Sequence, residues 1–294
     1  MTGLIVLALS LPCVYSAADA DSRARLKAAG VTHVCGDAEL ASREALPSPG
    51  IQARAGVASP TRSPWIVANG WRFTRRPNAK YVYDVPAGKA ALAASEAFAY
   101  GADAVLKIDA ADLDNAGAML TFLERVPPVE LPPIADLAVV DDGSAITGEV
   151  MNLLARRNLL FQVVQAPSSQ FRINVAVGSR EYPREEAADP SAFALKIRRQ
   201  LTDEQRSLRV YGSEVVITRL TGDTRRIRLH LINYGGRELE GLRVRVRGAY
   251  RGDEALVSGA GRLKLEDAVV ADGATEFTLP RLTTYAVIDL NAAR

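Results

Sequence analysis

The chain of 294 residues has few of the residues that most often hold metals or crosslink a fold. It contains two cysteines, Cys13 and Cys35, and two histidines, His33 and His230. Two separated histidines are too few for a histidine-rich metal site, and we expect neither a metal nor another cofactor. The formal net charge is only +2, so the overall charge does not favour nucleic acid or an anionic membrane as a partner.

A short apolar run near the start, Leu4–Leu11, carries no charge and is too short to span a bilayer. The small residues Ser16, Ala18 and Ala20 follow at the spacing of a signal-peptidase site. The pattern predicts an export signal over residues 1–20, no integral membrane segment after its removal, and a secreted or periplasmic protein. The alternative is a buried first strand, because the first three residues include no Lys or Arg.

Removal of residues 1–20 would leave Cys35 as the single cysteine, and no intrachain disulfide could then form. His33 and Cys35 alternate on a predicted strand, where residues two apart lie about 7 Å from each other. A Cys–His catalytic dyad is therefore disfavoured, and we expect a buried thiol at Cys35.

Residues 21–128 alternate between helix and strand patterns, which is typical of a parallel α/β region. Lys89–Tyr100 is an alanine-rich predicted helix, Gly101 ends it, and the predicted strand Ala104–Ile108 follows. The proline-rich segment Val126–Pro133 predicts a stiff connector and a domain boundary. The βαβ pattern then resumes over residues 134–205.

Residues 208–294 change to short alternating runs that turn residues separate, which predicts an antiparallel β-sandwich. The predicted fold class is α/β followed by all-β. It comprises a parallel α/β N-terminal region, a flavodoxin-like middle domain and a C-terminal antiparallel β-sandwich.

Three segments resemble parts of multidomain glycoside hydrolases related to the β-galactosidase families. Arg228–Val246 (RLHLINYGGRELEGLRVRV) is similar to their C-terminal sandwich, and Ala135–Gln165 to their flavodoxin-like, amidotransferase-like middle domain. Gly88–Asp109 (GKAALAASEAFAYGADAVLKID) resembles the closing βα units of their catalytic barrel. The resemblance implies a carbohydrate partner, a poly- or oligosaccharide.

The sequence departs from this family in two respects. A full (β/α)8 barrel needs about 200–250 residues, whereas only residues 21–126 lie between the predicted leader and the proline-rich connector. The expected barrel is therefore truncated or strongly reduced. The amidotransferase-like segment also lacks a cysteine nucleophile, so it does not support amidotransfer chemistry.

Glycoside hydrolysis uses two carboxylates, and in α/β folds functional residues follow the carboxyl ends of the strands. Asp84 and Asp109 both follow predicted strands and are the candidate catalytic pair. The alternative is that each caps the next helix or turn, as strand-ending aspartates usually do.

A cluster of aromatic residues is the candidate sugar-binding site, because flat rings stack on sugar rings and an amide bonds their hydroxyls. Its members are Trp65, Asn69, Trp71 and Tyr83. The alternative is that these side chains pack in the core.

Two further charged patterns could hold a ligand. Asp141-Asp142-Gly143-Ser144 ends a predicted strand, where open parallel sheets bind ligands, although a helix N-terminus explains it as well. Arginines alternate with apolar residues in Arg226–Leu231 and Leu242–Arg247. If these two strands pair, one sheet face carries five arginines and a histidine, which could hold an acidic polysaccharide or be a solvated, ion-paired surface.

The favoured function is an exported, carbohydrate-associated protein of glycoside hydrolase-like descent whose catalytic site is reduced or absent. One alternative is an active glycoside hydrolase that uses Asp84 and Asp109. The other is a non-catalytic structural or oligomerisation module, and a homo-oligomer stays open in every case.

Overall fold

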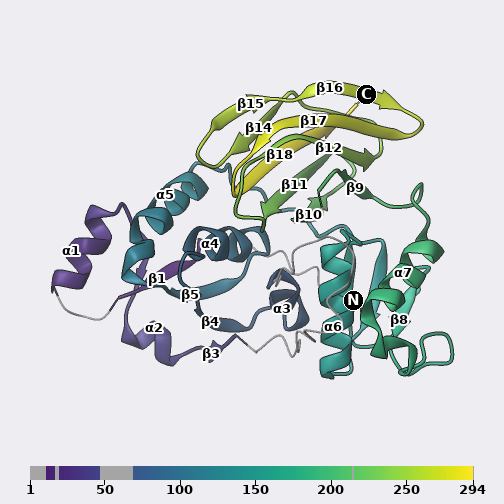
Figure 1. Ribbon diagram of the computed structural model, residues 1–294, viewed down its shortest axis with the longest axis horizontal. Coiled ribbons are helices and arrows are strands. Elements are labelled where there is room, and N and C mark those ends of the chain that lie inside the picture. Colours follow the sequence, from purple (N-terminus) through teal and green to yellow (C-terminus); the bar gives the residue numbers. More distant parts are fainter. Residues whose placement is uncertain (1–10, 17–19, 47–68, 214, 294) are drawn as a thin grey trace. The chain divides into compact units, whose positions relative to one another are not determined.

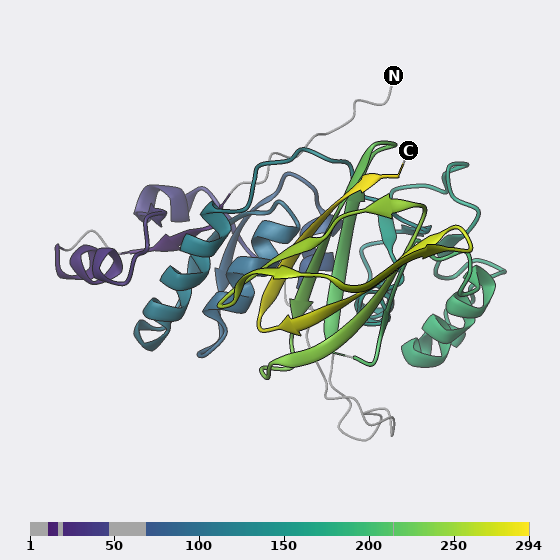
Figure 2. The same cartoon turned by 90° about the horizontal axis from the view of Figure 1, so that it is seen from above.

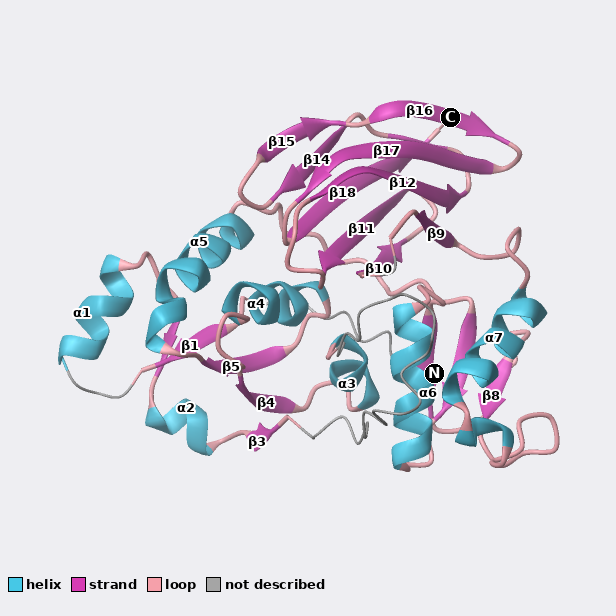
Figure 3. Cartoon of the chain, viewed as in Figure 1, coloured by secondary structure: helices cyan, strands magenta, loops and turns pink. Residues whose placement is uncertain are grey.

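The computed structural model describes residues 11–16, 20–46, 69–213 and 215–293. The chain forms two compact units: Met1–Pro47 with Arg76–Glu130, and Ser48–Arg75 with Leu131–Arg294. The junction at Glu130 lies inside the predicted proline-rich connector. Figure 1 labels the elements in chain order, and Figure 3 separates helices from strands. The fold class agrees with the prediction, because parallel α/β sheets are followed by antiparallel β-sheets.

The first unit contains a five-stranded, all-parallel sheet in the order β2-β1-β5-β4-β3. Its strands are β1 (Cys13–Tyr15), β2 (Val34–Cys35), β3 (Glu44–Ala45), β4 (Lys80–Asp84) and β5 (Asp103–Lys107). Its helices are α1 (Ala20–Ala28), α2 (Asp37–Ala41), α4 (Ala90–Ala99), the 3-10 helix η1 (Ala110–Asp112) and α5 (Leu113–Glu124).

The strand order of this sheet is that of an arc of a (β/α) barrel. The steps from β1 to β2, from β3 to β4 and from β4 to β5 all move in the same direction across the sheet. Parallel crossovers are right-handed, so steps in one direction place their helices on one face. A doubly wound sheet reverses direction and covers both faces, whereas a barrel does not. Among the described strands, β2 and β3 are the two edges of this sheet.

The two faces of this sheet differ in character. In-register parallel partners share a face, and alternate residues point to opposite faces. One face carries the buried residues Val14, Tyr81, Tyr83, Ala104 and Leu106, and we infer that the helices cover it. By the same inference the opposite face is free of helices, and it carries Tyr15, Cys35, Val82 and Val105 and the charged residues Lys80, Asp84, Asp103 and Lys107.

Strand β1 lies within the segment for which the sequence predicts an export signal. It lies between β2 and β5, so cleavage after Ala18 or Ala20 would remove an inner strand of the sheet. Val14 of this strand is fully buried, as the alternative of a buried first strand expects, and the export signal stays a prediction. Residues 1–10, which include most of the apolar run, lie outside the described residues.

The second unit includes a three-stranded parallel sheet in the order β7-β6-β8, which is the 2-1-3 order of flavodoxin-like folds. Its strands are β6 (Leu137–Val140), β7 (Phe161–Val164) and β8 (Asn174–Ala176), and its helices are α3 (Gly70–Arg75), α6 (Ala145–Arg156), the 3-10 helix η2 (Glu186–Ala188) and α7 (Pro190–Leu201). Helix α3 precedes the connector in sequence, yet it packs against α6 in this unit.

From Leu208 onward, all regular elements of the described chain are strands. They form two antiparallel sheets, which pack as a sandwich (Figure 2, green and yellow). The larger sheet contains β10 (Val216–Gly222), β11 (Arg226–Asn233), β13 (Tyr250–Arg251), β14 (Glu254–Val257), β15 (Gly261–Lys264) and β18 (Tyr285–Ala292). The smaller sheet has the order β16-β17-β12-β9 and contains β9 (Leu208–Tyr211), β12 (Leu239–Arg247), β16 (Glu266–Ala271) and β17 (Ala274–Leu282).

The sandwich core lies between the two sheets. It takes Ile227, Leu229 and Leu231 from β11 and Leu242 and Val244 from β12. Because β11 and β12 belong to different sheets and do not pair, the single face of five arginines and a histidine does not exist. The sequence alternation identified the inward residues correctly, but it did not identify the partner strand.

Candidate functional site

The carboxyl ends of the parallel strands in the first unit are the candidate site, because parallel α/β folds bind ligands at that end of their strands. On the helix-free face these ends bear Tyr15 of β1, Cys35 of β2, Asp84 of β4 and Lys107 of β5. Register pairs Tyr15 with Cys35 and Asp84 with Lys107, so strand pairing fixes each couple side by side.

The two predicted catalytic carboxylates hold different positions. Asp84 is exposed, and Lys107 Nζ lies 3.7 Å from its Oδ1. Asp109 caps the 3-10 helix η1, where its Oδ1 accepts a hydrogen bond of 2.8 Å from the Ala111 N–H. Capping is the alternative that the sequence analysis named for Asp109, and an exposed ion pair contributes little stability. Their use as a catalytic pair stays a prediction.

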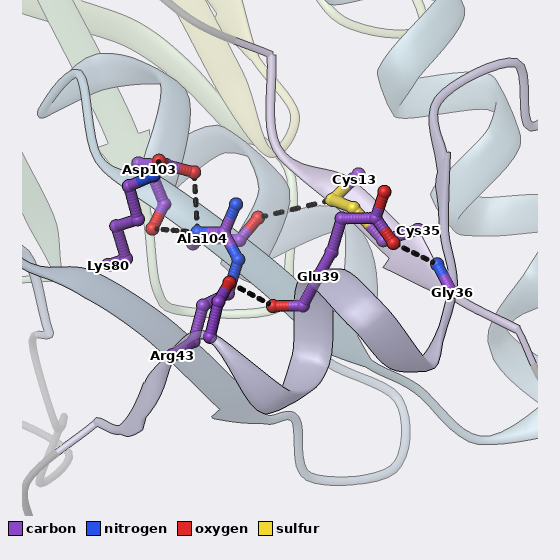
Figure 4. The surroundings of a disulfide bond; sticks show 9 residues. Cys13, Cys35, Gly36, Glu39, Arg43, Lys80, Asp103 and Ala104 are labelled. Carbon is purple, nitrogen blue, oxygen red and sulfur yellow. Dashed lines mark hydrogen bonds and ion pairs between the residues drawn. A yellow bond between two sulfur atoms is a disulfide. The ribbon is translucent and has the colours of Figure 1, made fainter.

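A disulfide joins Cys13 and Cys35 on this face, with Cα atoms 5.7 Å apart (Figure 4). The expectation of a free, buried thiol at Cys35 is therefore wrong. That expectation followed from assigning Cys13 to a removed leader, whereas Cys13 belongs to the inner strand β1.

Two acidic residues, Asp37 and Glu39, follow strand β2, and Figure 4 shows Glu39 with its hydrogen bond from Gly36. Tyr15 Oη donates to Asp37 Oδ1 at 2.7 Å, and this hydrogen bond raises the pKa of the phenol above its usual value. The Glu39 carboxylate accepts from its own N–H and from that of Gly36, which lowers the pKa of Glu39. The sequence did not identify this pair, because Tyr15 lies in the segment that was assigned to the leader.

At the amino ends of the strands, Asp103 binds Arg43 and Lys80 (Figure 4). Arg43 Nη1 lies 2.5 Å from Asp103 Oδ1 and also donates to the Asp103 carbonyl at 2.9 Å. Arg43 is largely buried, so this pair fastens the segment after α2 to β5. Its position at the amino ends indicates a stabilising role.

Three residues of the predicted sugar-binding cluster are buried. Trp71 is 2% exposed, Asn69 is 6% exposed and Tyr83 is 7% exposed. Asn69 and Trp71 belong to the second unit and Tyr83 to the first, while Trp65 lies outside the described residues. Stacking on a sugar requires an open ring face, so the structure gives this ligand role no support, and it stays a prediction.

Trp71 packs on helix α6, where the absence of a side chain at Gly148 makes room for the indole. A Cβ at Gly148 would lie 3.1 Å from Trp71 Cη2, which is tighter than ordinary packing. This contact joins α3 to α6 and explains the burial of Trp71.

The acidic pair after β6 is neutralised within the protein. Arg75 Nε and Nη2 donate to the two oxygens of Asp141 at 2.8 and 2.7 Å. For Asp142, partial burial favours the neutral acid, but hydrogen bonds from Ser144, Thr147 and Arg184 outweigh it and hold the pKa well below its usual range. Ser144 also caps α6, so this segment is a structured helix start.

Among the described residues no group of three His, Cys, Asp or Glu side chains could hold a metal ion. Within the same residues, no helix is long and apolar enough to cross a membrane.

The fold of this chain is similar to that of a solved α-L-fucosidase. The α-L-fucosidase isoenzyme 2 from Paenibacillus thiaminolyticus matches 89% of this chain and 68% of its own chain, with a TM-score of 0.59 and 11% identity. A GH42 β-galactosidase from G. stearothermophilus, solved as a catalytic mutant, matches 79% of this chain and 58% of its own, with a TM-score of 0.47 and 9% identity. No protein-family model matches the sequence, and no curated protein matches it.

Proposed function

We propose that this chain is a carbohydrate-associated protein of glycoside hydrolase-like descent with a reduced catalytic site. The observation that carries the proposal is the fold likeness to an α-L-fucosidase over 89% of the chain. A glycan would bind at the carboxyl ends of the parallel strands in the first unit, on the helix-free face. There Tyr15, Asp84 and Lys107 offer hydrogen-bonding groups to sugar hydroxyls.

The arrangement of the carboxylates supports a reduced site. Retaining and inverting hydrolases both need one carboxyl that donates a proton and a second that acts as nucleophile or base. Asp109 is engaged as a cap, and Asp84 is solvated beside Lys107.

The test assays the purified protein against aryl α-L-fucosides, aryl β-galactosides and an oligosaccharide array. We expect binding of at least one glycan, with turnover at background, and no change in turnover in Asp84→Asn or Asp109→Asn. The matched control is Asp114→Asn, an exposed aspartate in the first turn of α5.

Two results would contradict the proposal. Turnover that Asp84→Asn or Asp109→Asn abolishes, while Asp114→Asn preserves it, would identify an active hydrolase. Neither binding nor turnover with any glycan would favour a structural module.

We also propose that the protein is exported. The Cys13–Cys35 disulfide supports this proposal, because disulfides persist in oxidising compartments and are rare in the cytosol. The test is alkylation of whole cells before lysis, followed by mass measurement of the chain. Two alkylated cysteines in the native protein would contradict export.

A further inference from the structure

The outward face of the smaller sandwich sheet is a basic surface. Leu242, Val244 and Val246 of β12 point into the core. The alternating residues Arg243, Arg245 and Arg247 therefore point outward, about 7 Å apart along the strand.

The neighbouring strand β9 extends this surface. Register pairs Arg245 with Arg209 and Arg243 with Tyr211, so all four side chains share the outward face. The Arg209 guanidinium lies 4.7 Å from the centre of the Tyr211 ring and orients it by a cation–π contact. We call Arg209, Tyr211, Arg243, Arg245 and Arg247 the arginine–tyrosine face.

The carboxylates of this region are shared among several arginines. Glu276 of β17 is 3.2 Å from Arg243 and 3.6 Å from Arg245. Asp203 lies 3.2 Å from Arg209, and it also pairs with Arg198 and Arg206 at 3.3 Å each.

Arg245 and Arg247 each have an Nη1 atom that donates to no carboxylate of the described residues. Arg247 donates to the carbonyl oxygen of Gln205 and is exposed. Nη1 of Arg245 is buried and has no hydrogen-bond partner among the described residues. Glu266 and Asp267 belong to β16, at the other edge of the sheet, and the Asp267 carbonyl oxygen accepts a hydrogen bond of 3.0 Å from Arg243. The positive charge is therefore greatest on β9 and on Arg245 and Arg247 of β12.

We propose that the arginine–tyrosine face binds an acidic glycan, a polysaccharide whose sugars carry carboxylate groups. Planar guanidinium groups bind carboxylates in a bidentate manner, and an oriented phenol ring packs against a sugar ring. The choice of a glycan over other polyanions rests on the proposed function, whereas the site itself is separate from the strand ends of the first unit.

The test measures the affinity of the full chain for polygalacturonate, neutral galactan and single-stranded DNA. We expect polygalacturonate to bind in preference to the other two, and more weakly at about 200 mM than at about 50 mM salt. Arg209→Gln with Arg247→Gln should weaken this binding by about tenfold. The matched control is Arg225→Gln with Arg226→Gln, two exposed arginines at the start of β11.

A variant that is expected to strengthen binding tests the proposal even if the arginine variants fold poorly. Glu276→Gln removes the carboxylate that Arg243 and Arg245 share, and it should strengthen polygalacturonate binding several-fold. Tyr211→Ala should weaken binding at both salt concentrations, because a packing contact is not screened.

Equal loss in the control variant, weaker binding by Glu276→Gln, or DNA binding as tight as that of polygalacturonate would overturn the proposal. Binding of polygalacturonate that the arginine variants weaken, with no other glycan bound or turned over, would contradict the proposed glycan site of the first unit and leave this inference standing. Binding of neutral glycans alone would overturn this inference and leave the proposed function standing.

Discussion

Two buried asparagines in or beside helix α6 differ in the hydrogen bonds that their side chains make. Asn158, just beyond the helix, is 7% exposed, and its amide joins β10 through Val216 and Thr218. Asn152, inside the helix, is 1% exposed, and neither amide atom has a hydrogen-bond partner among the described residues. Buried polar groups cost free energy unless they are paired, so the two positions predict opposite effects of substitution.

Asn158→Ala should lower the free energy of unfolding by about 3 kcal/mol, because it leaves buried groups of Val216 and Thr218 unpaired. Part of this loss is conformational, since Asn158 has a φ of 51°, which alanine tolerates poorly. Asn158→Gly removes the bonds without that strain and should cost less than Asn158→Ala. Urea unfolding measures both, and equal stability of the alanine variant and the parent would contradict the role of Asn158.

Asn152→Leu should raise the free energy of unfolding by about 1 kcal/mol, because it replaces an unpaired buried amide with an apolar side chain of similar shape. Asn152→Asp, which buries a charge at the same position, should be strongly destabilising. The same urea series measures both variants. A clear loss of stability in Asn152→Leu would show that the amide is bonded in solution.

At the scale of the element, strand β11 combines a core face with a buried polar face. Arg228 is 1% exposed and donates to Asp289 of β18 from Nε at 2.6 Å and from Nη2 at 2.7 Å. His230 is also 1% exposed, and its Nδ1 lies 2.6 Å from the hydroxyl of Tyr285. Burial removes water from the imidazolium, and the charges of Arg228 and Arg219 oppose it further, so the pKa of His230 is well below its usual value.

Stability should therefore fall as the pH is lowered below about 6.5, the pKa of an unfolded histidine. Below this pH the histidine is protonated in the unfolded chain but stays neutral in the folded chain. The free energy of unfolding therefore falls by up to about 1.4 kcal/mol per pH unit for this group. Above that pH both states hold a neutral imidazole, and the effect disappears.

The measurement compares unfolding of the parent and His230→Gln between about pH 5.5 and 7.5. The variant should lose much of the pH dependence, whereas His33→Gln, at a half-exposed histidine, should keep it. A steeper slope in His230→Gln than in the parent would contradict the prediction.

At the scale of the whole molecule, the sheet of the first unit depends on a strand of three residues and one of two. Strands β1 and β2 share few backbone hydrogen bonds, and the Cys13–Cys35 disulfide closes the intervening loop that contains α1. A crosslink that closes a loop of this length stabilises a fold by about 3 kcal/mol.

The double variant Cys13→Ala, Cys35→Ala should lose about that much stability. The loss should be limited to the first unit, because both cysteines lie in it. Hydrogen exchange measures the two units separately. Faster exchange is expected for amides of β1 and β5, with unchanged exchange in the core strands of the sandwich. Uniform acceleration across both units would contradict this expectation.

The elements themselves were largely predictable, because their signals are local. The alanine-rich helix, the glycine that ends it and the strand that follows were placed within two residues of α4 and β5. The alternation of apolar residues also identified the inward faces of β11 and β12. The spacing of apolar residues and the choice of turn residues are local features that span a few positions. A single sequence is therefore enough to predict helices and strands from them.

The tertiary structure alone decided which segments meet. Alternation does not name a partner strand, so only the fold revealed that β11 and β12 lie in different sheets. The burial of Trp71 depends on a glycine 77 positions away in α6, and the disulfide depends on Cys13 belonging to an inner strand. Strand pairing, burial and ion-pair geometry arise from contacts between residues that are far apart in the sequence. The residues adjacent to each position therefore do not predict these features.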